Sequence, residues 1–282
     1  MKPSRILTGA SLFTLLGGLG LAQSTWWVDA DATAPGSGSP ANPYASIHYA
    51  VHQPNVVSGD VVLVLPGRYR ETVEIVDKYL TLRSTAGAAE TVIDALGTGT
   101  AVTVVASPGN SVRPNVVIIE GFTITGGTGT WRDDQLTGGG LLVENVELWL
   151  RKSIVRSNRA TLGAGIAVNS SLLDLYDVEI EDNQAETAVA LKDGKGGALH
   201  IAGPSIVRTE AVRMRENVAG LGGAVHAEDG ELEMLDTHIL GNMAWGETYD
   251  GIAAQGGGVY AVDAVLSIVA GRISENLAWC PN

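Results

Sequence analysis

The sequence has little cysteine and few aromatic residues. Cys280 is the only cysteine among 282 residues, so an internal disulfide is impossible and the fold must be stable without one. Aromatic residues make up 5% of the chain, and Phe13 and Phe122 are the only phenylalanines. The core must therefore consist mainly of Val, Ile, Leu and Ala.

Basic residues are also scarce. The chain carries 18 Lys and Arg against 31 Asp and Glu, which gives a formal net charge of −13. A surface this acidic repels the phosphates of nucleic acids, so we expect no nucleic-acid partner. The same charge is compatible with Ca²⁺, the one cofactor that the composition suggests, with a basic partner, or simply with solubility.

Long apolar runs are missing beyond the first residues of the chain. Lys2 and Arg5 precede an apolar run, and Gly20, Leu21 and Ala22 supply small residues after it. This pattern predicts a signal peptide over 1–22 and an exported chain over 23–282, extracellular or on the cell surface or outer membrane. The alternative is a short membrane anchor. No cysteine follows the run to carry a lipid, and we expect no transmembrane segment in the mature chain.

Glycine, in contrast, is abundant, with 36 residues, and it occurs in a repeated motif. The motif reads GGGLLV, GAGIAV, GGALHI, GGAVHA and GGGVYA, starting at Gly138, Gly163, Gly196, Gly222 and Gly256. In every repeat an asparagine follows 18 or 19 residues after the third motif position; these are Asn158, Asn183, Asn217, Asn242 and Asn276. A fixed unit that recurs in this way is typical of a solenoid.

The apolar residues of each unit alternate with polar ones, which indicates strands, and no unit has room for a helix. The sequence therefore predicts an all-β, right-handed parallel β-helix with regular coils over 138–276. Equivalent inward residues should stack from coil to coil; they are Leu141, Ile166, Leu199, Val225 and Val259. We expect the glycines at one corner of each coil and the asparagines in a single ladder at another.

The first half of the chain follows the pattern less strictly. The segment 116–127 (VVIIEGFTITGG) resembles the second part of a unit, with Ile124 at its apolar position and Gly127 in place of asparagine. Before it, Ile47, Ala50 and Val51 share one face at helical spacing. We expect a short capping helix there, within an N-terminal cap over about 42–58, which covers the edge of the first coil.

The run WWVDADATAPGSGSPANPYASIHYAV, continued by GDVVLVLPGRYRE and IEGFTITGG, resembles the right-handed parallel β-helix proteins of the pectin-lyase-like superfamily. The later glycine and asparagine units resemble the repeats of chlamydial polymorphic outer membrane proteins. The resemblance covers nearly all of 23–282. It implies the fold but not one activity, because this superfamily includes lyases, hydrolases, adhesins and non-catalytic surface proteins.

The C-terminal coil shows no cap. Only six residues follow Asn276, and they contain no further glycine motif. An uncovered strand edge invites pairing with another strand. Three explanations remain open: the chain continues in the native protein, the segment from Trp279 to Asn282 covers the end, or another chain makes an end-to-end contact.

One strand face is a candidate groove. The outward motif positions are Leu142, Ala167, His200, His226 and Tyr260. Longer links on alternate coils should form walls beside this face, and they contain Trp131, Asp133 and Asp134, then Lys192, Asp193 and Lys195, then Trp245, Glu247, Tyr249 and Asp250. His200, His226 and Tyr260 are the candidate catalytic residues, and Trp131, Asp133, Asp134, Trp245, Tyr249 and Asp250 the candidate ligand-binding residues.

Aromatic rings in such a groove stack on sugars, and histidines move protons near neutral pH. The lyases of the superfamily use a groove with acidic residues on Ca²⁺ and a basic Arg or Lys, yet no such cluster maps onto this face. The alternative is a surface ladder of His and Tyr with variable loops. We therefore expect a structural, adhesive or carbohydrate-binding protein that partners an extracellular glycan or a surface protein, with a polysaccharide lyase or glycoside hydrolase as the alternative.

Charged residues at the second strand of each unit alternate in sign. Arg156, Glu181 and Arg215 should be neighbours on successive coils, with Glu179 beside Arg213. Such cross-strand ion pairs set the register and indicate a structural role. The carboxylates of the same region, Asp174, Asp177, Glu179 and Glu181, are a further candidate for Ca²⁺.

Overall fold

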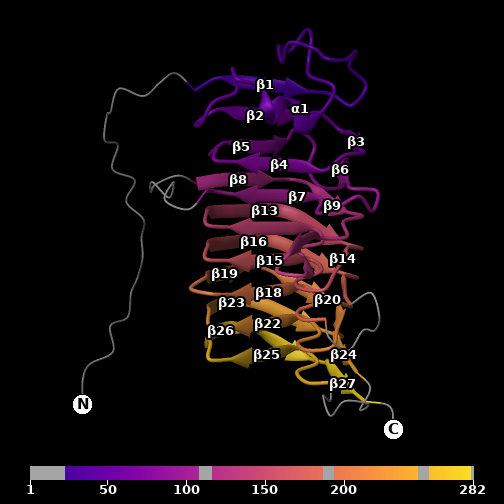
Figure 1. Ribbon diagram of the computed structural model, residues 1–282, viewed down its shortest axis with the longest axis vertical. Helices are drawn as coiled ribbons and strands as arrows, with labels where there is room; N and C mark the ends of the chain where they lie inside the picture. Colours follow the sequence, from indigo (N-terminus) through magenta and orange to yellow (C-terminus); the bar gives the residue numbers. More distant parts are fainter. Residues whose placement is uncertain (1–22, 108–115, 187–193, 247–253, 281–282) are drawn as a thin grey trace, which may run out of the picture.

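The computed structural model describes residues 23–107, 116–186, 194–246 and 254–280. Its strands stack on top of one another along a single axis from β1 to β27, with the only helix of the described residues, α1 (Ile47–His52), at the first end (Figure 1). The predicted signal peptide over 1–22 lies outside the described residues, as do Lys192, Asp193, Glu247, Tyr249 and Asp250.

Among the described residues, the coils contribute to three parallel sheets. The seven-stranded sheet contains β4 (Val73–Val76), β7 (Val102–Val105), β12 (Leu141–Glu144), β15 (Ile166–Asn169), β18 (Leu199–Ala202), β22 (Val225–Glu228) and β25 (Val259–Val262). The five-stranded sheet contains β14 (Arg159–Ala160), β17 (Gln184–Ala185), β21 (Val218–Ala219), β24 (Met243–Trp245) and β27 (Leu277–Trp279).

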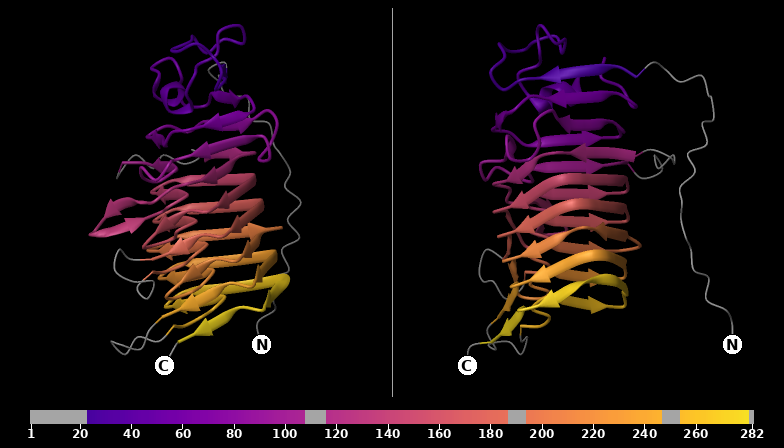
Figure 2. Two further views of the ribbon diagram at one scale, coloured as in Figure 1. Left: turned by 90° about the vertical axis from the view of Figure 1, so that its right-hand side faces the viewer. Right: turned by 180° about the vertical axis from the view of Figure 1, so that it is seen from behind.

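The thirteen-stranded sheet runs the whole length of the described chain. Its N-terminal strands are β1 (Thr25–Val28), β2 (Val61–Val64), β3 (Gly67–Tyr69), β5 (Thr81–Ser84), β6 (Thr91–Asp94), β8 (Val116–Glu120) and β9 (Thr123–Thr125). Its later strands are β13 (Glu147–Arg156), β16 (Leu172–Glu181), β19 (Ile206–Glu210), β20 (Arg213–Arg215), β23 (Glu231–Leu240) and β26 (Val265–Ser274). The antiparallel hairpin of β10 (Thr130–Arg132) and β11 (Gln135–Thr137) projects from the stack (Figure 2).

Successive coils pair in the register that the glycine motifs predict. Leu141 is opposite Ile166, which is opposite Leu199, and the column continues through Val225 to Val259. Because like positions meet in every layer, one side-chain pattern is sufficient to build the whole stack. The all-β parallel β-helix solenoid predicted from the sequence is therefore confirmed.

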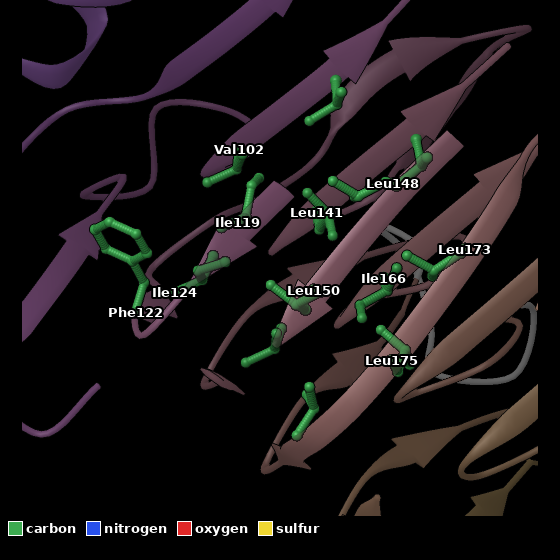
Figure 3. Close-up of a cluster of buried hydrophobic side chains, with 14 of the residues drawn as sticks. Val102, Ile119, Phe122, Ile124, Leu141, Leu148, Leu150, Ile166, Leu173 and Leu175 are labelled. Atoms are coloured by element: carbon green, nitrogen blue, oxygen red, sulfur yellow. The ribbon is translucent and has the colours of Figure 1, made fainter. Parts of the chain in front are cut away.

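The core lies between the seven-stranded and thirteen-stranded sheets. Leu141 and Ile166 enter it from the first, and Leu148, Leu150 and Leu173 from the second, all fully buried (Figure 3). Fully burying one such aliphatic side chain contributes roughly 1.5–3 kcal/mol. Aliphatic stacks of this kind replace the aromatic residues that the composition lacks.

The five asparagines lie in one column at the turn after each long strand, as their spacing predicts. Asn158 Nδ2 donates to Asn183 Oδ1 at 3.0 Å, and the same bond joins Asn183 to Asn217, Asn217 to Asn242 and Asn242 to Asn276, each at 2.9 Å. Each acceptor oxygen in these bonds also receives the backbone N–H of the preceding asparagine. The column satisfies buried polar groups that water cannot reach.

The structure adds two details to this corner. The left-handed residue is the one before each asparagine, at Ser157, Asp182, Glu216, Gly241 and Glu275. This arrangement leaves the asparagine itself free to turn its amide into the column. The backbone N–H of Gly127 donates to Asn158 Oδ1 at 2.9 Å, so the coil without an asparagine still occupies the end of the column, as predicted.

The N-terminal end is covered and the last described coil is not. Ile47, Ala50 and Val51 of α1 are buried, and Ser46 Oγ caps the helix by accepting from Tyr49 N at 3.0 Å. In β26, by contrast, Leu266 is 39% and Ile268 52% exposed. Strand β27 pairs with β24 and does not cross the edge of β26, so the part of Trp279 to Asn282 that is described leaves this edge open.

Candidate functional site

The outer face of the seven-stranded sheet carries the predicted histidine column, which consists of Leu142, Ala167, His200, His226 and Tyr260. The rings stack from coil to coil, with centroids 5.1 Å apart between His200 and His226 and 5.3 Å apart between His226 and Tyr260. The expected exposure is not found. His200 is 5% and His226 2% exposed, and Leu142 and Ala167 are buried as well.

The burial of the column follows from how the chain enters each strand. Gly222 has φ +64°, and a Cβ there would collide with the carbonyl oxygen of Val225 and lie 2.9 Å from His226 N. The first glycine of every other motif has the same conformation and the same close approach; these are Gly138, Gly163, Gly196 and Gly256. The chain thus folds back against the outside of the strand, and bridges between Leu162, Lys195 and Leu221 continue this cover from coil to coil.

Burial keeps both histidines neutral. It lowers the pKa of His200 to about 3, helped by the charge that His226 would carry and by Lys195, and it lowers the pKa of His226 to about 4. The Nδ1 atoms of both rings are buried without a hydrogen-bond partner. A general acid or base works best with a pKa near the operating pH, which neither ring has. The column has the chemistry of a stacked core.

Of the predicted ligand-binding residues, the structure describes Trp131, Asp133, Asp134 and Trp245. Trp131 is 67% exposed on β10, and Asp133 and Asp134 form the turn of its hairpin with φ +46° and +64°. Trp245 lies on β24, where its ring is 6.5 Å from that of Trp279. Within the described residues, no hydrogen bond, ion pair or ring contact joins the hairpin to Trp245.

Three of the four carboxylates of the candidate acidic cluster, Asp174, Glu179 and Glu181, are paired with arginines. Glu181 lies between Arg156 and Arg215 and forms ion pairs with both, and Glu179 pairs with Arg213 at 3.5 Å. The alternating charges predicted for successive coils therefore meet. Among the described residues there is no group of three or more His, Cys, Asp or Glu side chains that could hold a metal ion.

An open groove lies instead on the outer face of the thirteen-stranded sheet. It has a volume of about 730 Å³ and crosses β13, β16, β19, β23 and β26, and we call it the tyrosine groove. Sequence reasoning missed it. The signal was Tyr176, an exposed aromatic residue at an outward strand position, between the outward charges of Asp174 and Asp177.

The groove exists because the long strands bend. Lys152, Asp177, Asp236 and Ala270 have positive φ in the middle of β13, β16, β23 and β26, and Ala211 has it between β19 and β20. A left-handed residue changes the chain direction, and Asp is among the residues that tolerate it. Repeated in five successive coils, the bend produces a continuous angle in the outer surface.

Two side-chain columns line the tyrosine groove. In the first, Asp174, Arg208 and Glu233 are in register, and Arg208 forms ion pairs with the other two at 3.9 and 2.8 Å. Burial raises the pKa of Asp174, although Arg208 opposes this effect. In the second column, Arg151 is opposite Tyr176, which is opposite Glu210.

No protein-family model matches the chain, and no curated protein matches it. Among solved structures, it is similar to the crystal structure of Escherichia coli YbhC, with 13% identity over 93% of this chain and 77% of that one and a TM-score of 0.42. It is also similar to a rhamnogalacturonan lyase, with 9% identity over 90% of this chain and 89% of that one and a TM-score of 0.29.

The class of the protein rests on its own strand arrangement. It is a parallel β-helix solenoid with stacked coils and an internal asparagine column. No helix of the described residues is long and apolar enough to span a bilayer.

Proposed function

We propose that this protein is exported to the cell surface or the extracellular space and has a structural, adhesive or carbohydrate-binding role without catalysis. The observation that carries the proposal is the histidine column. The stacked pair His200 and His226 is buried at 5% and 2% exposure, with pKa values lowered to about 3 and 4. Export rests on the signal-peptide pattern over 1–22.

The alternative, a polysaccharide lyase or glycoside hydrolase, is tested by turnover. The purified protein is incubated with polyuronates and neutral polysaccharides, while the absorbance of unsaturated uronates and the release of reducing ends are followed. We expect neither signal to rise. Turnover that disappears in a folded His226→Phe variant would contradict the proposal, because the ring would then be acting as an acid or base.

Binding through the loops is tested separately on a glycan array. If Trp131 of the hairpin and Trp245 of β24 contact the glycan, Trp131→Ala and Trp245→Ala should each lose the array signal of the wild-type chain. Signal retained in both variants would exclude these tryptophans as the glycan site.

Export is tested by fractionation of cells that express either the full chain or a chain without residues 2–22. Only the full chain should deliver protein outside the cytoplasm.

The proposal also includes an end-to-end contact with a partner chain at the last described coil. Strand β26 offers ten residues of backbone along an edge with no strand partner in the described chain, and Arg272 is its only charged residue. In a symmetric antiparallel pair of two β26 strands, Arg272 would be opposite Ser267, so like charges do not meet. We expect a second copy of the chain at this edge, and size-exclusion chromatography with light scattering should show a concentration-dependent dimer that Ile268→Lys abolishes. A strictly monomeric chain at all concentrations would contradict this part.

A further inference from the structure

The tyrosine groove has the features of a binding surface that the histidine column lacks. Tyr176 is 44% and Leu235 45% exposed in the same column, two coils apart with Glu210 between them. Both side chains line a groove of about 730 Å³ whose lining also includes seven charged residues, and apolar surface rimmed by polar residues is a feature of interaction sites. The face therefore offers ring and aliphatic surface to a ligand.

Tyr176 is placed between a side chain that donates hydrogen bonds and one that accepts them. Arg151 precedes it and Glu210 follows it in the column, each one coil away. Within the described residues neither side chain is in an ion pair or a side-chain hydrogen bond, and the guanidinium of Arg151 lies 4.5 Å from the centroid of the Trp149 ring. An aromatic platform with free polar groups on both sides suits a ligand with an apolar face and a rim of hydroxyls.

The charges of the groove favour an uncharged ligand. Its lining contains three basic and four acidic side chains; they are Arg151, Lys152 and Arg208 against Glu120, Asp174, Glu210 and Glu233. Several are neutralised in place, since Arg208 pairs with Asp174 and Glu233, and Glu120 pairs with Lys152 at 3.1 Å and with Arg83 at 3.3 Å. A polyanion would meet the acidic majority of the whole chain, and a polycation would meet the arginines.

The direction of the groove favours a chain-like ligand rather than a compact one. It crosses five consecutive strands, and neighbouring parallel strands are about 4.8 Å apart, so its polar groups recur at that interval. An extended peptide binds best along a strand edge, where backbone groups are free. Here the backbone groups are already used by the parallel ladders, so only side chains can meet the polar groups of the ligand.

We propose that the tyrosine groove binds an extended, uncharged glycan, with one sugar ring on Tyr176 and its hydroxyls on Arg151 and Glu210. This inference rests on the carbohydrate-binding role proposed above and places that role on the thirteen-stranded sheet, away from the loop tryptophans. The ligand lies along the solenoid axis, and each coil contacts a short portion of it.

The test is calorimetric titration of the full chain with hexasaccharides of β-1,4-linked glucose, mannose and xylose, and with hexagalacturonate as the acidic comparison. We expect at least one neutral hexasaccharide to bind and hexagalacturonate to bind more weakly. Tyr176→Ala should weaken the neutral ligand about tenfold, because a ring stacked on an aromatic side chain loses its platform. Glu210→Gln should weaken it less, since the amide still accepts a hydrogen bond.

Tyr79→Ala is the matched control, because Tyr79 is 38% exposed but lies outside the groove, and its Kd should equal that of the wild type. Wild-type affinity in Tyr176→Ala, or tighter binding of hexagalacturonate, would overturn the inference. If Trp131→Ala or Trp245→Ala weakens binding while Tyr176→Ala does not, the carbohydrate-binding role stands and the groove is excluded. If the wild type binds no glycan at all, both the inference and that role are overturned.

Discussion

The two outer faces of the solenoid are built from the same repeats and have opposite properties. On the seven-stranded sheet the outward side chains of Leu142, Ala167, His200 and His226 are buried and uncharged. On the thirteen-stranded sheet the outward side chains form an open groove that contains Tyr176 and paired charges. A β-helix thus does not present every outward strand position to solvent.

The difference originates in the segments next to the strands. Before the seven-stranded sheet, a glycine with positive φ folds the chain back against the outside of the strand that follows. Within the thirteen-stranded sheet, a left-handed residue in the middle of the strand bends it and opens an angle. Local backbone conformation at two positions per coil therefore determines which face is covered.

The largest effect is expected from the asparagine column, which both faces share. Asn217→Ala removes the Nδ2 bonds to Ile180 O and Asn242 Oδ1 and the acceptor for Asn183. Several buried groups are then unsatisfied, at about 1–3 kcal/mol each, so the free energy of unfolding should fall by about 3 kcal/mol or more. Urea denaturation measures this, with the exposed Arg272→Ala as the control; a loss below about 1 kcal/mol would show that the column contributes little.

The second-largest loss of stability is expected at Gly222, where the chain folds back over the histidine column. Gly222→Ala introduces a Cβ into contact with the carbonyl oxygen of Val225, in addition to the left-handed strain. Gly241→Ala is the matched control, because Gly241 has φ +63° and open space around its added Cβ. Left-handed strain costs roughly 1–2 kcal/mol for one residue. In the same denaturation experiment, we expect the free energy of unfolding to fall by about that much in Gly241→Ala and by clearly more in Gly222→Ala. Equal losses would mean that the close approach of Gly222 to Val225 does not contribute to the cost.

The pH dependence of stability distinguishes a buried histidine column from an exposed one. Both folded pKa values lie below the ordinary value of 6.5, so the unfolded chain binds more protons below that pH. The contribution of the neutral rings is complete above about pH 6.5 and decreases as the pH falls toward about 4, by at most about 1.4 kcal/mol per pH unit for each ring.

His226→Phe keeps a stacked ring but removes one titrating group, so its free energy of unfolding should fall less steeply between pH 7 and 5.5 than that of the wild type. Identical slopes for the two proteins would show that His226 titrates equally in the folded and unfolded chain.

The smallest effect belongs to the open face. Glu181 and Arg215 are close but lie at the surface, with the arginine side chain 43% exposed. A double-mutant cycle with Glu181→Gln and Arg215→Gln should give a coupling of about 0.2–1 kcal/mol that decreases in high salt. A coupling of several kcal/mol that is independent of salt would indicate that this face is as closed as the histidine column.

Much of the fold could be predicted from the sequence because the repeat is strict. The fixed interval from glycine motif to asparagine places Asn183 and Asn217 in one column, and alternation identifies Leu199 and Val225 as core residues. Periodicity alone assigns a residue to the inner or outer side of a strand. It does not show whether the outer side is covered, which is why His226 was expected at the surface.

The tyrosine groove could not be predicted for a similar reason. It depends on the left-handed conformation of Lys152, Asp177 and their equivalents, which range from Asp to Ala and leave no common sequence pattern. The loop tryptophans attracted attention because aromatic residues are rare in this chain. Tyr176 is also one of the few aromatic residues, but it lies within a strand among acidic residues and was not singled out.

Titration of the histidine ring protons by NMR tests the central claim most directly, with His200→Phe and His226→Phe to assign the signals. A closed column predicts that His226 stays neutral until about pH 4 and His200 until about pH 3. Titration of His200 and His226 near pH 6.5 would contradict it, because the face would then be open to water and able to transfer protons.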